Sequence, residues 1–106
     1  MNVRLEERPT EVIAWLTGEL DHHAAEFVRR ELDTALDMRR GCRLVLDMSG
    51  LSFMDSSGIG VILGRYKKVK ATGGRLAVRG VNEKMDRILR LAGLYQVVER
   101  EGGRKA

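Results

Sequence analysis

The alternation of apolar and polar residues predicts a regular succession of strands and helices. Apolar residues at every second position, or in short β-branched runs, indicate strands, whereas recurrence every three or four residues indicates helices. Pro9 and Thr10 are a turn signal that should join the first two strands into a hairpin. We expect strands at 2–7, 11–17, 43–48, 75–79 and 95–98, helices at 22–38, 57–71 and 83–92, and a loop at 49–55.

The helical segments carry apolar stripes that a sheet can bury. Asp21 and Asn82 stand where capping residues are favoured, and Gly93 is suited to the end of the last helix. Arg29, Arg30, Glu31 and Asp33 should point outward. The residues expected to face inward are Ala25, Val28, Leu32, Ala35 and Leu36 on the first helix, and Met85, Ile88, Leu89 and Ala92 on the third.

This order of elements predicts a compact α/β fold. Strands that alternate with helices are joined by crossovers and lie parallel, so the hairpin should lead into βαβ units. The result is a mixed sheet with helices packed on it. We expect a single domain over residues 1–106, with residues 101–106 frayed.

Composition points to a protein of the reducing cytoplasm. No apolar run approaches the roughly 20 residues of a membrane span, and the N-terminus has no apolar signal region. The single cysteine, Cys42, rules out an internal disulfide and is expected to be a small buried apolar residue.

The net charge of +4 does not indicate nucleic-acid binding. The 19 basic residues are spread along the chain, and aromatic residues, which would stack on bases, are only 5%. Charge of this size is an ordinary aid to solubility, and it favours encounter with an acidic partner.

Residues 55–58, Asp-Ser-Ser-Gly, stand where the expected loop meets the second helix. Serine and aspartate are preferred capping residues because their side-chain oxygens accept from free N–H groups of the first turn. A helix N-terminus also favours an anion, so a phosphate on Ser56 or Ser57 would be accommodated there. Local chemistry alone favours the interpretation that both serines are only caps, because such caps are common.

The glycines of this helix superficially suggest a dinucleotide site. In that fingerprint the first glycine follows the strand directly. Here residues 48–57 separate Gly58 from the strand, and the next strand ends in Arg79 rather than an acidic residue. We expect instead that Gly58, Gly60 and Gly64 let the helix lie close to the sheet.

The spacing of the serines and histidines also argues against a hydrolase site and a metal site. A nucleophile elbow needs Gly-x-Ser-x-Gly, but Met54 and Asp55 occupy the glycine position in the two possible registers. His22 and His23 are adjacent, so they lack the spacing of a metal pair. We interpret them as polar residues of a first helical turn.

Asp47, at the end of an apolar strand, suggests the phospho-acceptor of a response-regulator receiver. A receiver also needs an acidic pair after its first strand and a lysine after its last, and residues 16–18 and 97–99 supply neither. We therefore expect Asp47 to lie at a strand end, in a turn with Ser49 and Gly50.

Two segments together carry a resemblance to a known family. Residues 51–67, Leu-Ser-Phe-Met-Asp-Ser-Ser-Gly-Ile-Gly-Val-Ile-Leu-Gly-Arg-Tyr-Lys, and residues 16–26, Leu-Thr-Gly-Glu-Leu-Asp-His-His-Ala-Ala-Glu, closely resemble anti-sigma factor antagonists of the sporulation sigma-F type, within the STAS domain family. The similarity extends to Val98 and implies a STAS-type fold. Family members usually carry a further C-terminal helix, for which this chain is too short and too glycine-rich.

The resemblance implies a non-enzymatic switch that regulates transcription. The unmodified protein would bind an anti-sigma factor that is also a serine kinase, and so free the sigma factor. The kinase would use its own ATP and Mg²⁺ to phosphorylate Ser56, and a serine phosphatase would reset the switch. This chain would need no cofactor or metal. The alternative is a STAS module that binds a partner in another signalling or transport assembly without phosphorylation.

The partner surface should combine two segments, because both follow strands predicted to lie side by side. Loops beyond the carboxyl ends of parallel strands form one rim, where ligands gather. The residues expected on this surface are Asp21, His22, His23, Met54, Asp55, Ser56, Ser57, Gly58, Ile59 and Gly60.

Overall fold

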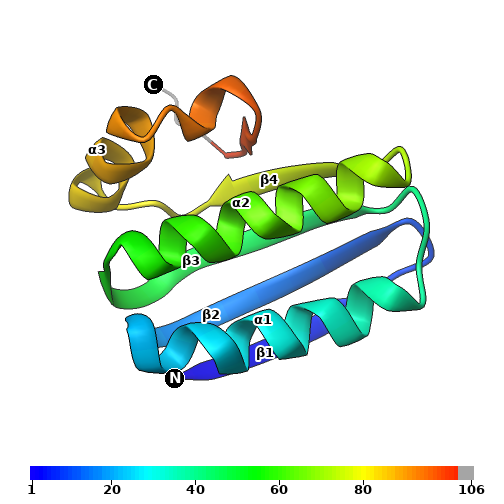
Figure 1. Ribbon diagram of the computed structural model, residues 1–106, viewed down its shortest axis with the longest axis horizontal. Coiled ribbons are helices and arrows are strands. Elements are labelled where there is room, and N and C mark those ends of the chain that lie inside the picture. Colours follow the sequence, from blue (N-terminus) through cyan, green and yellow to red (C-terminus); the bar gives the residue numbers. More distant parts are fainter. Residues whose placement is uncertain (103–106) are drawn as a thin grey trace.

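The computed structural model describes residues 1–102 and confirms the α/β architecture (Figure 1). The strands are β1 (Asn2–Glu7), β2 (Glu11–Leu20), β3 (Arg43–Met54), β4 (Arg75–Arg79) and β5 (Glu99–Arg100). The helices are α1 (His22–Asp37), α2 (Ser56–Ala71) and α3 (Glu83–Leu91), followed by a 3₁₀ turn, η1 (Leu94–Gln96).

The five strands form one mixed sheet in the order β1-β2-β3-β4-β5. β1 pairs antiparallel with β2, which confirms the predicted hairpin. The other neighbouring strands are parallel, as the alternation of strands and helices predicted.

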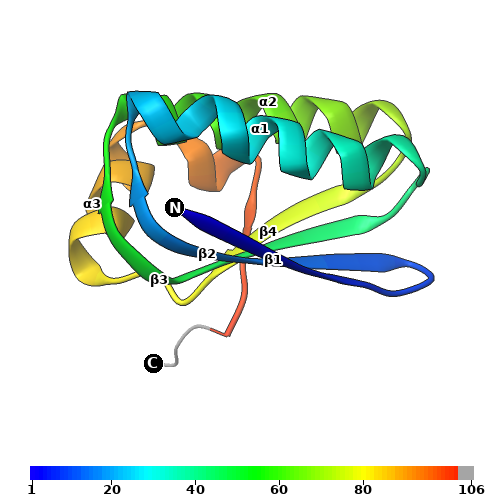
Figure 2. The same ribbon diagram turned by 90° about the horizontal axis from the view of Figure 1, so that it is seen from below.

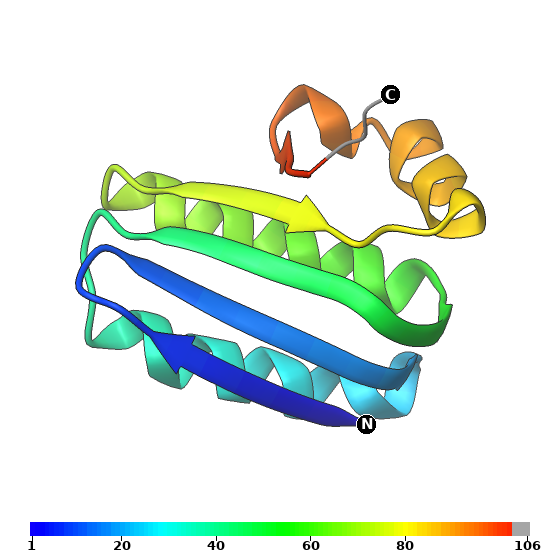
Figure 3. The same ribbon diagram turned by 180° about the vertical axis from the view of Figure 1, so that it is seen from behind.

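The core lies between the sheet and two helices. Figure 2 shows α1 and α2 side by side on one face of the sheet, and Figure 3 shows α3 and η1 beyond β4, on the side of the sheet where β5 lies. Leu44 and Leu46 of β3 are fully buried towards the helices, where they pack with Leu32 and Ile62. On the opposite face, the side chains of Ile13, Val45 and Ala77, which lie in register across β2, β3 and β4, form a second small cluster with Trp15.

β2 and β3 are longer than predicted, and the expected loop at 49–55 is wrong. β3 continues to Met54 and β2 to Leu20, and β3 carries an extra residue at each of two register shifts. Such bulges bend a strand, and both strands curve towards the helix layer at this end (Figure 2). The register is Trp15 opposite Asp47, Thr17 opposite Gly50, Gly18 opposite Leu51, and Glu19 opposite Phe53.

The prediction that Asp47 ends a strand is therefore also wrong. Asp47 lies within β3 beside the first bulge, and its Oδ1 accepts hydrogen bonds from the Ser49 N–H and Oγ at 3.0 and 2.6 Å. The other carboxylate oxygen accepts from Arg79 Nε at 2.8 Å. The predicted turn with Ser49 and Gly50 is wrong as well, because these hydrogen bonds stabilise a bulge within β3.

The C-terminal part differs most from the prediction. The segment expected as a strand at 95–98 forms η1 and its continuation, and β5 begins only at Glu99. Ala92, which was expected to face inward, is the C-cap residue of α3 and is exposed. Of the segment expected to fray, Glu101 donates its N–H to the Val78 carbonyl at 2.8 Å, and residues 103–106 lie outside the described part.

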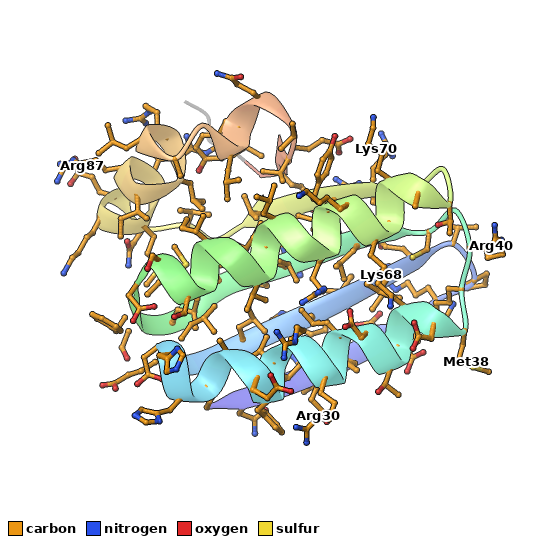
Figure 4. All side chains as sticks on the ribbon, in the orientation of Figure 1. Arg30, Met38, Arg40, Lys68, Lys70 and Arg87 are labelled. Carbon is orange, nitrogen blue, oxygen red and sulfur yellow. The ribbon has the colours of Figure 1, made fainter. Side chains whose placement is uncertain are left out.

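A charged contact joins α1 to α2. Arg65 is 7% exposed, and its Nε lies 3.0 Å from Asp33 Oδ1. Lys68 lies on the same side of α2, over α1 in Figure 4, and its Nζ is 2.7 Å from Asp37 Oδ1. Asp33 was expected to point outward, but the neighbouring helix partly covers it.

The surface of residues 1–102 agrees with two expectations from composition. Arg30, Arg40, Lys70 and Arg87 project from different parts of the molecule in Figure 4, so these basic groups do not share one face. Cys42 is 3% exposed. No helix in this part of the chain is long and apolar enough to cross a membrane.

Candidate functional site

The ends of β2 and β3 bring the two predicted segments together. Leu20 and Met54 are direct partners in the parallel ladder, and the Asp55 N–H points to the Leu20 carbonyl at 3.4 Å. α1 therefore begins beside α2, because each helix starts within two residues of this pair. The juxtaposition expected from two parallel strands is correct.

An aspartate caps each of the two helices. Asp21 Oδ1 accepts a hydrogen bond from the Ala24 N–H at 2.9 Å, and Asp55 Oδ1 accepts one from the Ser57 N–H at 2.8 Å. The bond from Ala24 lowers the pKa of Asp21, and the nearby His23 lowers it further. Two carboxylates therefore stand at neighbouring helix N-termini, where the helix dipoles favour negative charge.

The two serines of the motif have different environments. Ser56 is the first residue of α2 and its side chain is exposed. Ser57 is only partly exposed, and its backbone N–H is already bonded to the Asp55 carboxylate. Ser56 is the more accessible of the two to another protein.

Two residues of the expected surface are buried and need correction. Met54 is 4% exposed, and Gly58 is buried. Met54 is the last residue of β3 and packs in the main core, because side chains alternate between the faces of a strand. We conclude that both residues shape the site from beneath and present no side chain to a partner.

The expectation that all three glycines of α2 allow close packing holds only for Gly58. A Cβ atom at Gly58 would lie 2.4 Å from Met54 Cγ, whereas a Cβ at Gly60 or Gly64 would meet no atom within 4 Å. The spacing alone could not separate these positions, because it does not say which side of the helix faces the sheet.

The remaining residues of the expected surface are accessible. His22 and His23 are exposed first-turn residues of α1, with ring centroids 6.0 Å apart. Ile59 is partly exposed, and Gly60 is exposed. The residues thus form a mixed surface of carboxylates, imidazoles, hydroxyls and one aliphatic side chain.

Phe53 is a candidate that the sequence interpretation missed. It is 42% exposed, it pairs with Glu19 in the ladder, and it directly precedes the buried Met54. The alternation of faces along a strand would have placed Phe53 outward, but residues 49–55 were interpreted as a loop, to which that rule does not apply.

A cavity of about 770 Å³ lies at the opposite end of the parallel strands. Two arginines that line it already have carboxylate partners. Arg43 Nη1 lies 3.0 Å from Glu11 Oε2, and Arg43 Nη2 lies 3.4 Å from Glu99 Oε1. Arg75 Nη1 lies 3.2 Å from Glu99 Oε2. Within residues 1–102, no three histidine, cysteine or acidic residues are grouped so as to hold a metal ion. The cavity is separate from the Ser56 region.

Comparison with known proteins identifies the family. The STAS domain model matches residues 2–102. The chain belongs to the STAS domain family. It is 42% identical over 98 residues to an anti-sigma F factor antagonist of Paenibacillus polymyxa, and the match covers 92% of this chain and 84% of that protein.

Two solved structures of one STAS protein are also similar. The unphosphorylated form of the anti-sigma factor antagonist SpoIIAA aligns with a TM-score of 0.81 at 32% identity, covering 93% of this chain and 87% of SpoIIAA. The phosphorylated form of SpoIIAA from Bacillus aligns with a TM-score of 0.73 at 33% identity, covering 93% and 90%. The fold implied by the sequence resemblance is confirmed.

Proposed function

We propose that this STAS protein is an anti-sigma factor antagonist controlled by phosphorylation of Ser56. The unphosphorylated form binds an anti-sigma factor with serine kinase activity, and the sigma factor is released. The kinase supplies the ATP and Mg²⁺, and a serine phosphatase restores the active form. The chain itself performs no catalysis and acts in the cytoplasm. The similarity to an anti-sigma F factor antagonist supports this function, and a sporulation sigma factor as the final target.

One observation carries the assignment of the acceptor. Ser56 is exposed at the first position of α2, directly after the capping Asp55. A kinase must reach the hydroxyl oxygen, and Ser57 is less accessible. The existence of a phosphorylated form of the similar SpoIIAA supports phosphorylation of this protein as well.

The energies favour a change in binding over a change in fold. A phosphate adds about −1.5 to −2 charges at neutral pH. Its interaction with the helix dipole is worth about 0.3–1 kcal/mol, whereas an unpaired charge buried at an interface costs on the order of 2–5 kcal/mol. The second term is larger, so phosphorylation should break the complex. Asp55 and Asp21 add like charge and strengthen the effect.

The binding surface combines the ends of β2 and β3 with the first turns of α1 and α2. Asp21 and Asp55 would pair with basic groups of the kinase and speed encounter. Ile59 and the newly recognised Phe53 would supply apolar contact. The other side chains we assign to this surface are His22, His23, Ser56 and Ser57, with the exposed backbone of Gly60, whereas Met54 and Gly58 support it from below.

The alternative function is a STAS module that binds its partner without phosphorylation. The two hypotheses differ in whether Ser56 is ever modified. The exposed hydroxyl at a helix N-terminus favours the switch, because a permanent binding surface would not require a serine there.

The test uses the anti-sigma F factor of Paenibacillus polymyxa, because this chain is 42% identical to an anti-sigma F factor antagonist of that organism. The purified proteins are mixed with Mg²⁺ and ATP, and phosphate is located by mass spectrometry. We expect stoichiometric phosphate on Ser56.

Three variants accompany this test. Ser56→Ala should bind the kinase without being phosphorylated, Ser56→Asp should bind more weakly, and Ser57→Ala, the control, should still be phosphorylated. Phosphate on Ser57 with Ser56 untouched would contradict the assignment. Tight binding with no phosphate on either serine would favour the alternative function.

A further inference from the structure

We propose that Gly58 is a positioning residue for phosphorylation. Because Gly58 has no side chain, the first turn of α2 can pack directly against Met54 and Leu20. This contact determines the position of the Ser56 hydroxyl relative to the kinase. The inference rests on the proposed function. It assigns Gly58 a steric role in the phosphorylation step, although the residue is buried and cannot contact a partner.

The contact beneath Gly58 leaves no room for a methyl group. A Cβ there would lie 2.4 Å from Met54 Cγ, 2.8 Å from Met54 Sδ and 3.1 Å from Leu20 Cδ2. Ordinary van der Waals contact begins near 3.4 Å, so the nearest pair would have to separate by about 1 Å.

The obstructing atoms have little freedom to move away. Met54 is 4% exposed and Leu20 is fully buried, and both belong to the main core. Cγ is the first atom beyond Cβ in methionine, so rotation of the distal end of the side chain cannot remove the closest contact. Interiors are close-packed, so the strain should be relieved by lifting the first turn of α2.

The displacement would act directly on the candidate site. Ser56 lies two residues before Gly58 in the same helical turn. Met54 and Leu20 are paired at the end of the ladder, and the capping Asp55 and Asp21 follow them. A methyl group at position 58 therefore shifts the Ser56 hydroxyl relative to Asp21 and the first turn of α1. We assign both to the surface that the kinase binds.

A matched control exists almost two turns further along the same helix. Gly64 is partly exposed, and a Cβ added there would meet nothing within 4 Å. Gly64→Ala makes the same chemical change in the same helix as Gly58→Ala, and alanine is the better helix former in both cases. A loss seen in Gly58→Ala but not in Gly64→Ala is therefore not a general effect of replacing a glycine of α2.

The experiment measures phosphorylation kinetics with the Paenibacillus polymyxa anti-sigma F factor and Mg–ATP, with the full chain as the varied substrate. A misplacement of 1 Å at a reacting group can cost about 100-fold in rate. We expect Gly58→Ala to lower kcat at least tenfold and to change KM less than about threefold, because most of the binding surface is retained. Gly64→Ala should match the wild type in both constants.

Rescue tests whether the contact with Met54 causes the loss of activity. Met54→Ala removes Cγ and Sδ, so the double variant Met54→Ala/Gly58→Ala no longer has the closest contact. We expect its kcat to equal that of Met54→Ala alone within about threefold. Circular dichroism and urea unfolding of each variant establish that kinetics are compared between folded proteins. If Gly58→Ala does not fold, a double variant at least tenfold slower than Met54→Ala still overturns the proposal.

The outcomes are distinguishable. A wild-type protein that is not phosphorylated on Ser56 defeats the proposed function. If the wild type is phosphorylated, three results overturn the role of Gly58: an unchanged kcat in folded Gly58→Ala, a change confined to KM, or a double variant at least tenfold slower than Met54→Ala.

Discussion

The buried contact between α1 and α2 leads to a prediction about stability. Arg65 Nε and Asp33 Oδ1 are 3.0 Å apart, but they are misaligned for a hydrogen bond, and Arg65 Nη1 has no hydrogen-bond partner among the described residues. Burial lowers the pKa of the Arg65 guanidinium, and the Asp33 carboxylate opposes this shift. The buried guanidinium therefore depends on the Asp33 carboxylate for compensation, whereas Asp33 is also in contact with water.

Removing the Asp33 charge should cost more stability than removing the Arg65 charge, because it leaves the buried guanidinium without its carboxylate. Loss of one partner from a buried pair typically costs about 3–5 kcal/mol. The Asp33 side chain is 29% exposed, so water can partly compensate, and we expect Asp33→Asn to lower the free energy of unfolding by about 2–3 kcal/mol. For a domain of this size that corresponds to a fall in Tm of about 10–20 °C.

Two comparisons make the reasoning refutable. Arg65→Met removes the more deeply buried charge and leaves Asp33 with access to water and with Lys68 Nζ 3.8 Å away, so it should lower the free energy of unfolding by no more than about 1 kcal/mol. Asp37→Asn, the control one turn later on α1, breaks an exposed ion pair with Lys68 and should also cost less than about 1 kcal/mol. Urea unfolding at pH 7, with m-values that stay constant, measures the change in the free energy of unfolding for all three variants. Equal costs for Asp33→Asn and Asp37→Asn would refute the argument, as would a larger loss in Arg65→Met than in Asp33→Asn.

Two further predictions concern single groups. Asp21→Asn keeps an oxygen that can accept from the Ala24 N–H, so it should preserve the helix cap but slow association with the kinase at low salt, as stopped-flow binding would measure. If the association rate equals that of the wild type, Asp21 is only a capping residue. Burial and the hydrogen bond to Asp86 raise the pKa of Tyr95 to about 12. This contribution to stability is complete below pH 10 and is lost as the pH rises to 12, so the stability difference between wild type and Tyr95→Phe should shrink over that range; a difference independent of pH would contradict it.

Local signals predicted the helices and their ends well. α1 and α2 begin within a residue of the predicted positions, because Asp21 and Asp55 stop the preceding strands and accept from first-turn N–H groups. Val28 and Leu32 are buried as the helical spacing indicated. Such features depend on residues within one or two turns, so the sequence is sufficient to specify them.

The ends of the strands were harder to predict, because pairing partners decide them. Residues 49–53, Ser-Gly-Leu-Ser-Phe, have the composition of a turn, but they form strand because β2 supplies hydrogen-bonding partners as far as Leu20. Residues 95–98 have the apolar character of a strand, but only Glu99 and Arg100 pair with β4. A short apolar run does not reveal whether a neighbouring edge is within reach.

The sequence by itself determined the family, the α/β alternation, the two capping aspartates and the serine that we propose as phosphate acceptor. Only the tertiary structure decided that Leu20 and Met54 meet across the sheet, that Phe53 faces outward, and that Gly58, unlike Gly60 and Gly64, lies against the core. The physical reason is that capping and helical periodicity arise from bonds between residues close in the chain. The facing of Gly58 and the length of β3 depend on how β3 pairs with β2, whose residues lie more than 30 positions earlier in the chain.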